Sequence, residues 1–130
     1  MDPNESVRAV ISEQTVTVES DVPAHVVAET LHNERTGAVI VIAGGKPVGI
    51  VAERDLVTAI AQSWDLAALD AGDLVAPSLV TAAPTDDLRS AAQLMIRHHV
   101  RHLPVVEDDR IVGVLSALDL LRVLSASDSA

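Results

Sequence analysis

A short phrase occurs twice in this 130-residue chain, and its recurrence limits the folds open to it. The run Val48–Val51, followed by Asp55, recurs as Val112–Leu115, followed by Asp119, at an offset of 64 residues. The same offset aligns further pairs without a gap: Val16 with Val80, Ala28 with Ala92, and Val41 with Val105. A tandem repeat of this kind predicts two copies of one supersecondary unit. Because a copy of about 55 residues has little core of its own, we expect the copies to bury their apolar faces against each other.

Each copy is predicted to be a β-α-β-β-α unit. A short β-rich run leads to a turn containing Pro and Asp, which suits the start of a helix. After that helix, two continuous apolar runs joined by a polar turn indicate a hairpin in a covered sheet, and a second helix closes the unit. The predicted strands are Val16–Val18, Ala38–Ala43 and Val48–Val51, then Val80–Ala82, Leu103–Val106 and Ile111–Leu115, with final helices from near Ala52 and Ser116. The predicted fold class is therefore α/β (α+β), with two such repeats.

The repeat divides the chain into four parts. Residues 1–62 form the first repeat, 63–71 a connector, 72–124 the second repeat, and 125–130 a frayed tail. The connector contains Trp64 and several small residues, and it is apolar enough to pack as a short helix. The segments Ser6–Ile11 and Gly72–Val75, which lead into the two copies, are each expected to form a helical turn.

Composition excludes several classes of protein. Without Cys, the chain has no disulfide, no thiol nucleophile and no Cys-ligated metal site. A formal net charge of -10 repels nucleic-acid backbones, and Trp64 as the single aromatic residue provides no platform for stacking bases. No run of about 18 apolar residues is present, and the N-terminus is acidic, unlike that of a signal peptide. We expect a soluble, cytoplasmic protein that binds neither nucleic acid nor membrane.

Two motifs in the second copy resemble a known family. Arg101–Val106 precedes the hairpin, and Gly113–Asp119 follows the pattern Gly-h-x-Ser/Thr-x-x-Asp, where h is apolar. In this order within a tandem β-α-β-β-α repeat, they resemble paired cystathionine-β-synthase (CBS) domains, known as a Bateman module. The resemblance implies two repeats packed sheet to sheet with pseudo-two-fold symmetry, and disc-shaped dimers. It also implies an adenosine-containing ligand (AMP, ADP, ATP, NAD or S-adenosylmethionine) in clefts between the copies.

The resemblance assigns roles to residues at the two final helices. Asp119 would accept hydrogen bonds from ribose hydroxyls, and Ser116 would bond ribose or phosphate. This chemistry is reasonable, because a carboxylate is a double acceptor and a helix N-terminus favours an anion. The first copy keeps Asp55 but has Ala52 in place of the hydroxyl, with Arg54 as a candidate source of positive charge.

The resemblance also assigns the entries to the apolar strands. Arg101 and His102 would face ligand phosphates, whereas their counterparts in the first copy, Gly37 and Ala38, carry no charge. In the family, the strand entry of one copy lines the pocket whose Asp comes from the other copy. Thr36, Gly37 and Ala38 would therefore complete the Asp119 site, and 100–102 would adjoin the Asp55 site. Arg101 is alternatively a solvated or salt-bridged surface residue.

A structural interpretation competes with ribose binding. Ser-x-x-Asp is close to a capping box, in which Ser116 caps the last helix and Asp119 lies in its first turn. Asp55 can likewise be an acid of a first helical turn. We favour ribose binding because both copies retain the Asp, whereas only one retains the capping hydroxyl.

No paired catalytic residues are visible, and no metal site is predicted, since adjacent histidines such as His98 and His99 point in different directions on a helix.

The leading hypothesis is a non-catalytic sensor of energy or metabolite state that requires no cofactor, binds an adenosine nucleotide and acts on a separate effector protein. The alternative is a structural homodimerisation module with vestigial clefts. The last helix is apolar almost all round, with Leu118, Leu121 and Leu124, which predicts a homodimer contact.

Overall fold

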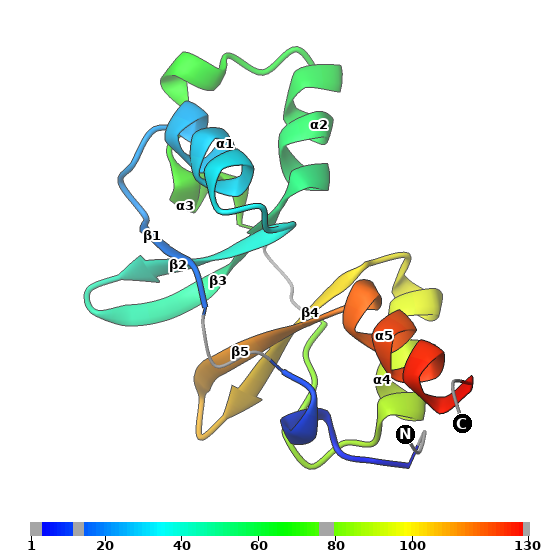
Figure 1. The fold of residues 1–130 in the computed structure, drawn as a ribbon. Coiled ribbons are helices and arrows are strands. Elements are labelled where there is room, and N and C mark those ends of the chain that lie inside the picture. The colour runs from blue at the N-terminus through cyan, green and yellow to red at the C-terminus, as the bar shows by residue number, and fades with distance from the viewer. Residues whose placement is uncertain (1–3, 12–14, 76–79, 129–130) are drawn as a thin grey trace. The chain divides into compact units, whose positions relative to one another are not determined.

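The computed structural model describes residues 4–11, 15–75 and 80–128, and it confirms a mixed α/β fold built from two repeats (Figure 1). The first repeat contains one parallel and one antiparallel strand pairing, and the second is built around a hairpin. The elements between residues 4 and 75 are η1 (Val7–Ala9), β1 (Thr17–Glu19), α1 (Ala24–Asn33), β2 (Ala38–Ala43), β3 (Lys46–Ala52), α2 (Glu53–Ala61), η2 (Leu66–Ala68) and α3 (Ala71–Leu74). Those between residues 80 and 128 are α4 (Leu88–His98), β4 (His102–Glu107), β5 (Arg110–Ser116) and α5 (Ala117–Asp128).

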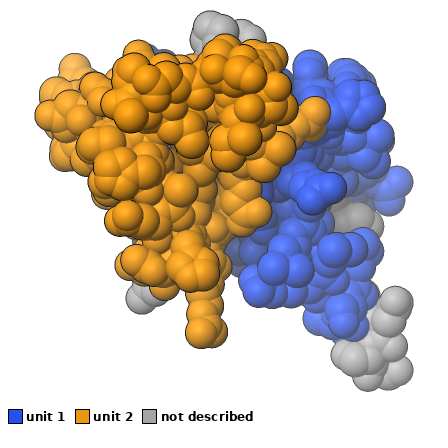
Figure 2. Space-filling view, turned by 90° about the horizontal axis from the view of Figure 1, so that it is seen from above, with its two compact units in different colours: residues 1–14, 80–130 blue, residues 15–79 orange. Residues whose placement is uncertain are grey.

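The chain forms two compact units that do not coincide with the two repeats along the sequence. One unit contains residues 1–14 and 80–130, and the other contains residues 15–79 (blue and orange in Figure 2). Each unit therefore combines the hairpin and helices of one repeat with the short segment that leads into the other repeat. The predicted helical turns in those leading segments are confirmed as η1 and α3.

The N-terminal leading segment is joined to the second repeat by backbone hydrogen bonds. The Val7 N–H donates to the Asp86 carbonyl at 2.8 Å, and the Leu88 N–H donates to the Glu5 carbonyl at 2.9 Å. Val7 is fully buried in the same apolar cluster as residues of α4, β4 and β5. Arg8 adds an ion pair with Glu107 at the end of β4.

The leading segment of the second repeat makes the equivalent contacts with the first repeat. The Ala71 N–H donates to the Val22 carbonyl at 2.8 Å, and the Ala24 N–H donates to the Leu69 carbonyl at 2.9 Å. Ala71 is fully buried, as Val7 is. Every donor and acceptor here lies 64 positions from its counterpart in the other unit, so the two repeats exchange their leading segments reciprocally.

In the unit of residues 15–79, helices α1 and α2 cover one face of the sheet (Figure 1). Strand β1 is parallel to β2, and β2 is antiparallel to β3. Successive side chains of β2 point to opposite faces of the sheet, so that Val39 and Val41 join the cluster beneath the helices. The rest of this buried cluster is Ala24, Val27, Leu31, Val51, Leu56, Ala59, Ala71 and Leu74.

Hydrogen bonds attach strand β1 to the edge of β2. Besides the regular ladder, the Ile40 N–H donates to the Val16 carbonyl at 2.9 Å, and the Ser20 N–H donates to the Ile42 carbonyl at 2.8 Å. These two bonds lie at the two ends of the pairing. They require a backbone N–H at both Ile40 and Ser20.

The second repeat lacks both donors, and the strand predicted over Val80–Ala82 is reduced to one bridge between Ala82 and Val105. The residues equivalent to Ile40 and Ser20 are prolines, Pro104 and Pro84, which have no N–H to donate. Two hydrogen bonds remain, and both involve Ala82. Its N–H donates to the Pro104 carbonyl at 2.9 Å, and its carbonyl accepts from the Val106 N–H at 2.8 Å. The prediction of a full strand here was wrong, because Pro84 and Pro104 cannot donate the hydrogen bonds that hold the two ends of β1 in the first copy.

Candidate functional site

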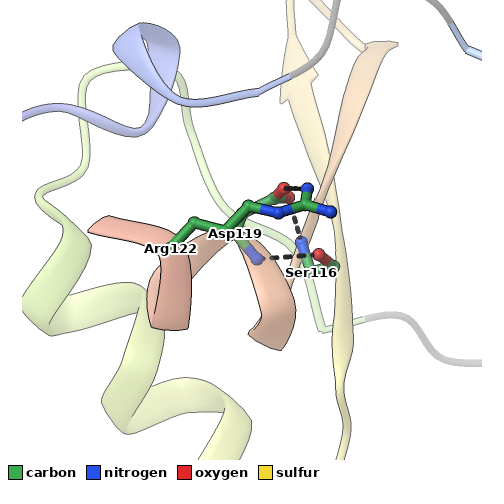
Figure 3. Close-up of polar contacts among 3 residues, drawn as sticks. All are labelled: Ser116, Asp119 and Arg122. Carbon is green, nitrogen blue, oxygen red and sulfur yellow. Dashed lines mark hydrogen bonds and ion pairs between the residues drawn. The ribbon is translucent and has the colours of Figure 1, made fainter. Parts of the chain in front are cut away.

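The start of helix α5 holds the most complete group of predicted site residues. Strand β5 ends at Ser116, and α5 begins at the next residue. One carboxylate oxygen of Asp119, Oδ2, accepts from the Ser116 N–H at 2.8 Å, and the Ser116 Oγ accepts from the Asp119 N–H at 3.1 Å (Figure 3). These two bonds form a reciprocal capping box, which fixes the carboxylate against the first turn.

The second carboxylate oxygen of Asp119 faces a cation. Its Oδ1 lies 3.6 Å from an Arg122 guanidinium nitrogen, so the two groups form an ion pair (Figure 3). The Asp119 side chain is 19% exposed, whereas that of Arg122 is 71% exposed. Sequence analysis missed Arg122, although a basic residue three positions after an acid on a helix is the signal that could have found it.

The first copy forms half of the same box. Asp55 Oδ2 accepts from the Ala52 N–H at 2.7 Å, although Ala52 has no side-chain oxygen to return a bond. The inference that capping explains the Asp in only one copy is therefore wrong, because the carboxylate needs only the backbone N–H. Both Asp side chains therefore have a structural role. The retention of Asp in both copies does not favour ribose binding over capping, and ribose binding stays a prediction.

The strand entries lie next to these helix starts within each unit. The Ala117 N–H donates to the Arg101 carbonyl at 2.8 Å, and His102 pairs with Ser116 in the β4–β5 ladder. The Arg101 backbone therefore lies beside the start of α5, the helix that carries Asp119. Arg101 is exposed and His102 is half-buried, and the exposure of Arg101 also fits the interpretation that it is a surface residue.

The first copy repeats this arrangement. The Glu53 N–H donates to the Gly37 carbonyl at 3.1 Å, and Ala38 pairs with Ala52 across β2 and β3. Thr36 Oγ1 donates to the Ala38 carbonyl at 3.1 Å, which stiffens the strand entry.

The predicted site residues thus form two groups, one in each unit. Arg101, His102, Ser116 and Asp119 belong to one, and Thr36, Gly37, Ala38, Arg54 and Asp55 belong to the other. The resemblance implies that each binding site combines residues of both copies, and this stays a prediction.

Another capping carboxylate lies away from both groups, at the start of α4. Asp87 Oδ1 accepts from the Ser90 N–H at 2.7 Å. This backbone hydrogen bond, together with a contact to the Ser90 side chain, lowers the pKa of Asp87. Asp87 is therefore a suitable control for a carboxylate whose role is capping.

The histidines do not converge on a metal geometry. His98 and His99 are exposed at the end of α4, where His99 has a left-handed backbone with φ of 54°. Across residues 4–11, 15–75 and 80–128, no three His, Asp or Glu side chains are placed to hold a metal ion.

Over that same part of the chain, every helix is too short or too polar to cross a membrane.

Comparison with known proteins gives a family match over both repeats. The model of the CBS domain matches residues 7–62 and 71–126. An uncharacterized protein of Methanocaldococcus jannaschii is 27% identical over 124 residues. The match covers 95% of this chain but only 44% of that relative.

Solved structures share the fold over almost the whole chain. A CBS domain protein of Pyrobaculum aerophilum complexed with AMP has a TM-score of 0.81 and 31% identity, covering 97% of this chain and 100% of that one. The CBS domain pair of a protein solved in complex with 5′-methylthioadenosine and S-adenosyl-L-methionine has a TM-score of 0.82 and 23% identity. That match covers 92% of this chain and 99% of the other.

Proposed function

Because the chain belongs to the CBS-domain family, we propose that it is a non-catalytic regulatory module that binds an adenosine-containing nucleotide. The observation that carries the proposal is the geometry of Asp119, whose carboxylate is held rigidly at a helix start with one oxygen, Oδ1, outside the capping box. A fixed carboxylate oxygen is a good acceptor for a ribose hydroxyl.

The known structures support adenosine as the common part of the ligand. The relative that is 31% identical was solved with AMP. The more distant CBS pair was solved with two other adenosine compounds, 5′-methylthioadenosine and S-adenosyl-L-methionine. The ligands of these proteins differ in the group on the ribose, so we propose the adenosine class and choose AMP as the first probe.

Replacement of Asp119 by Ala tests the proposal. We expect Asp119→Ala to weaken AMP binding at least about tenfold in calorimetry, because a charge-assisted hydrogen bond to the ribose is lost. The same change removes one of the two hydrogen bonds of the capping box of α5, with a stability cost of about 0.5–1.5 kcal/mol. Binding is therefore measured at a temperature where circular dichroism shows that the variant is folded.

Asp87→Ala is the matched control. It also removes a carboxylate that caps a helix, at the start of α4, and it should leave AMP affinity unchanged. An equal loss of affinity in the two variants would mean that Asp119 acts only through stability. If wild-type protein binds no adenine nucleotide at all, the alternative holds, namely a structural dimerisation module with vestigial clefts.

We also propose that the module forms a homodimer through apolar stripes on α2 and α5. The two stripes occupy equivalent positions of the two repeats: Val57 corresponds to Leu121, and Ile60 to Leu124. All four side chains are more than half exposed, as is Leu118. An exposed apolar stripe in each unit fits burial against a second, identical chain.

Leu121→Glu is expected to convert the dimer to a monomer, because it places a charge in the centre of the α5 stripe. The mass in solution is measured by light scattering after size-exclusion chromatography. Ile96→Glu is the control, since Ile96 is 75% exposed on α4 and lies outside both stripes. A wild-type protein that is monomeric at high concentration, or a Leu121→Glu variant that stays dimeric, would contradict the proposed interface.

A further inference from the structure

Arg122 is the basic side chain that contacts the carboxylate of the proposed ribose site. Its guanidinium Nη1 lies 3.6 Å from Asp119 Oδ1, and the side chain is 71% exposed. A guanidinium carries five N–H donors in a planar fork, which suits phosphate oxygens. The pair with Asp119 therefore leaves most of this donor capacity exposed to solvent.

The first copy has no equivalent cation. The position 64 residues before Arg122 is Thr58, so Asp55 has an uncharged residue three positions later on its helix. The first copy instead has Arg54 directly before Asp55, where the second copy has Leu118. In a chain of formal net charge -10, a bound phosphate needs local positive charge, and Arg122 supplies it on the helix that carries Asp119.

We propose that Arg122 is a specificity-determining residue, which makes the Asp119 site prefer phosphorylated adenosine to adenosine itself. The inference rests on the proposed function, since it assumes that Asp119 binds the ribose. The phosphate of AMP is attached to that same ribose, within the reach of a long and flexible arginine side chain. When the ribose occupies Oδ1, Arg122 exchanges its pair with Asp119 for a stronger one with the phosphate.

Calorimetry with AMP and with adenosine tests this exchange. In wild-type protein we expect AMP to bind more tightly than adenosine. Arg122→Gln should weaken AMP binding about tenfold, because a charge-assisted contact is lost, and should change adenosine binding less than twofold. Arg122→Lys, which keeps the charge, should retain a preference for AMP that is reduced but present.

Arg110→Gln is the charge-matched control. Arg110 is exposed at the start of β5, and Ser116 ends the same strand, about 20 Å away at the usual rise per residue. This variant changes the net charge as Arg122→Gln does and should leave both affinities unchanged.

Three results would overturn the proposal in distinguishable ways. Equal losses for AMP and adenosine in Arg122→Gln would show that Arg122 only positions Asp119. An unchanged AMP affinity would show that Arg122 is an ordinary surface residue. Absence of binding of either compound to wild-type protein would overturn the proposed function itself, and the preference with it.

Discussion

Val7→Asp is expected to lower the free energy of unfolding by about 3–5 kcal/mol, because it places an unpaired carboxylate in a fully buried position. The loss of stability should be largest in the unit that contains residues 80–130, although most of that unit lies more than 70 residues further along the chain. Hydrogen exchange should show lost protection in β4 and β5, and less change in β2 and β3. Denaturant unfolding followed by circular dichroism gives the size of the effect.

The control for Val7→Asp is Ala9→Asp, two residues later in the same helical turn. Ala9 is exposed, so the same charge should cost less than about 0.5 kcal/mol there. Burial raises the pKa of an introduced carboxyl, and so the Val7→Asp penalty should develop above the ordinary Asp pKa of about 3.9 and shrink below it. Protection lost first in β2 and β3 would contradict the exchange of leading segments.

Gly49→Ala is expected to destabilise the other unit by about 1–3 kcal/mol. A Cβ at Gly49 would overlap the Cγ1 atom of Val75, which comes from the exchanged leading segment. Val75 is β-branched, so it has few rotamers with which to move away. Thermal or denaturant unfolding measures the loss.

Two further variants isolate the overlap as the cause. Val75→Ala should restore much of the stability of Gly49→Ala in a double-mutant cycle, because it removes the overlapping methyl group. Gly113→Ala is the matched variant in the other unit, where the Cβ would lie 3.1 Å from the Cδ1 of Ile11. That atom ends a flexible side chain, so the cost should be smaller. Equal costs at the two glycines, or no recovery in the double variant, would contradict the mechanism.

Local sequence signals predicted the hairpins and the helices that follow them. The runs 38–43 and 103–106 are apolar without a break, and short turns follow them, so the strands could be assigned without knowledge of their partners. Val80–Ala82 was different, since a strand at a sheet edge depends on hydrogen bonds with its neighbour. Pro104 in the neighbouring strand and Pro84 just after the segment each lack a donor, although the β-rich residues themselves are present.

The candidate site was predicted only in part. The resemblance selected Asp119 and Ser116, and the structure places them at one helix start. The structure also shows that Asp55 is anchored to a backbone N–H, which a comparison of side chains alone could not reveal. Arg122 lies outside the motif Gly113–Asp119, so the resemblance did not select it, although it lies on the same helix three residues after Asp119.

The sequence by itself determined that the chain contains two copies of one unit, because apolar periodicity and turn residues are local and repeat in a fixed register. Only the tertiary structure decided which segments share a core. The exchange is made by backbone hydrogen bonds, such as that between Val7 and Asp86, and by small buried side chains such as Ala71. Every residue other than proline offers the same backbone donor and acceptor, so the amino-acid sequence does not show which distant segments these bonds join.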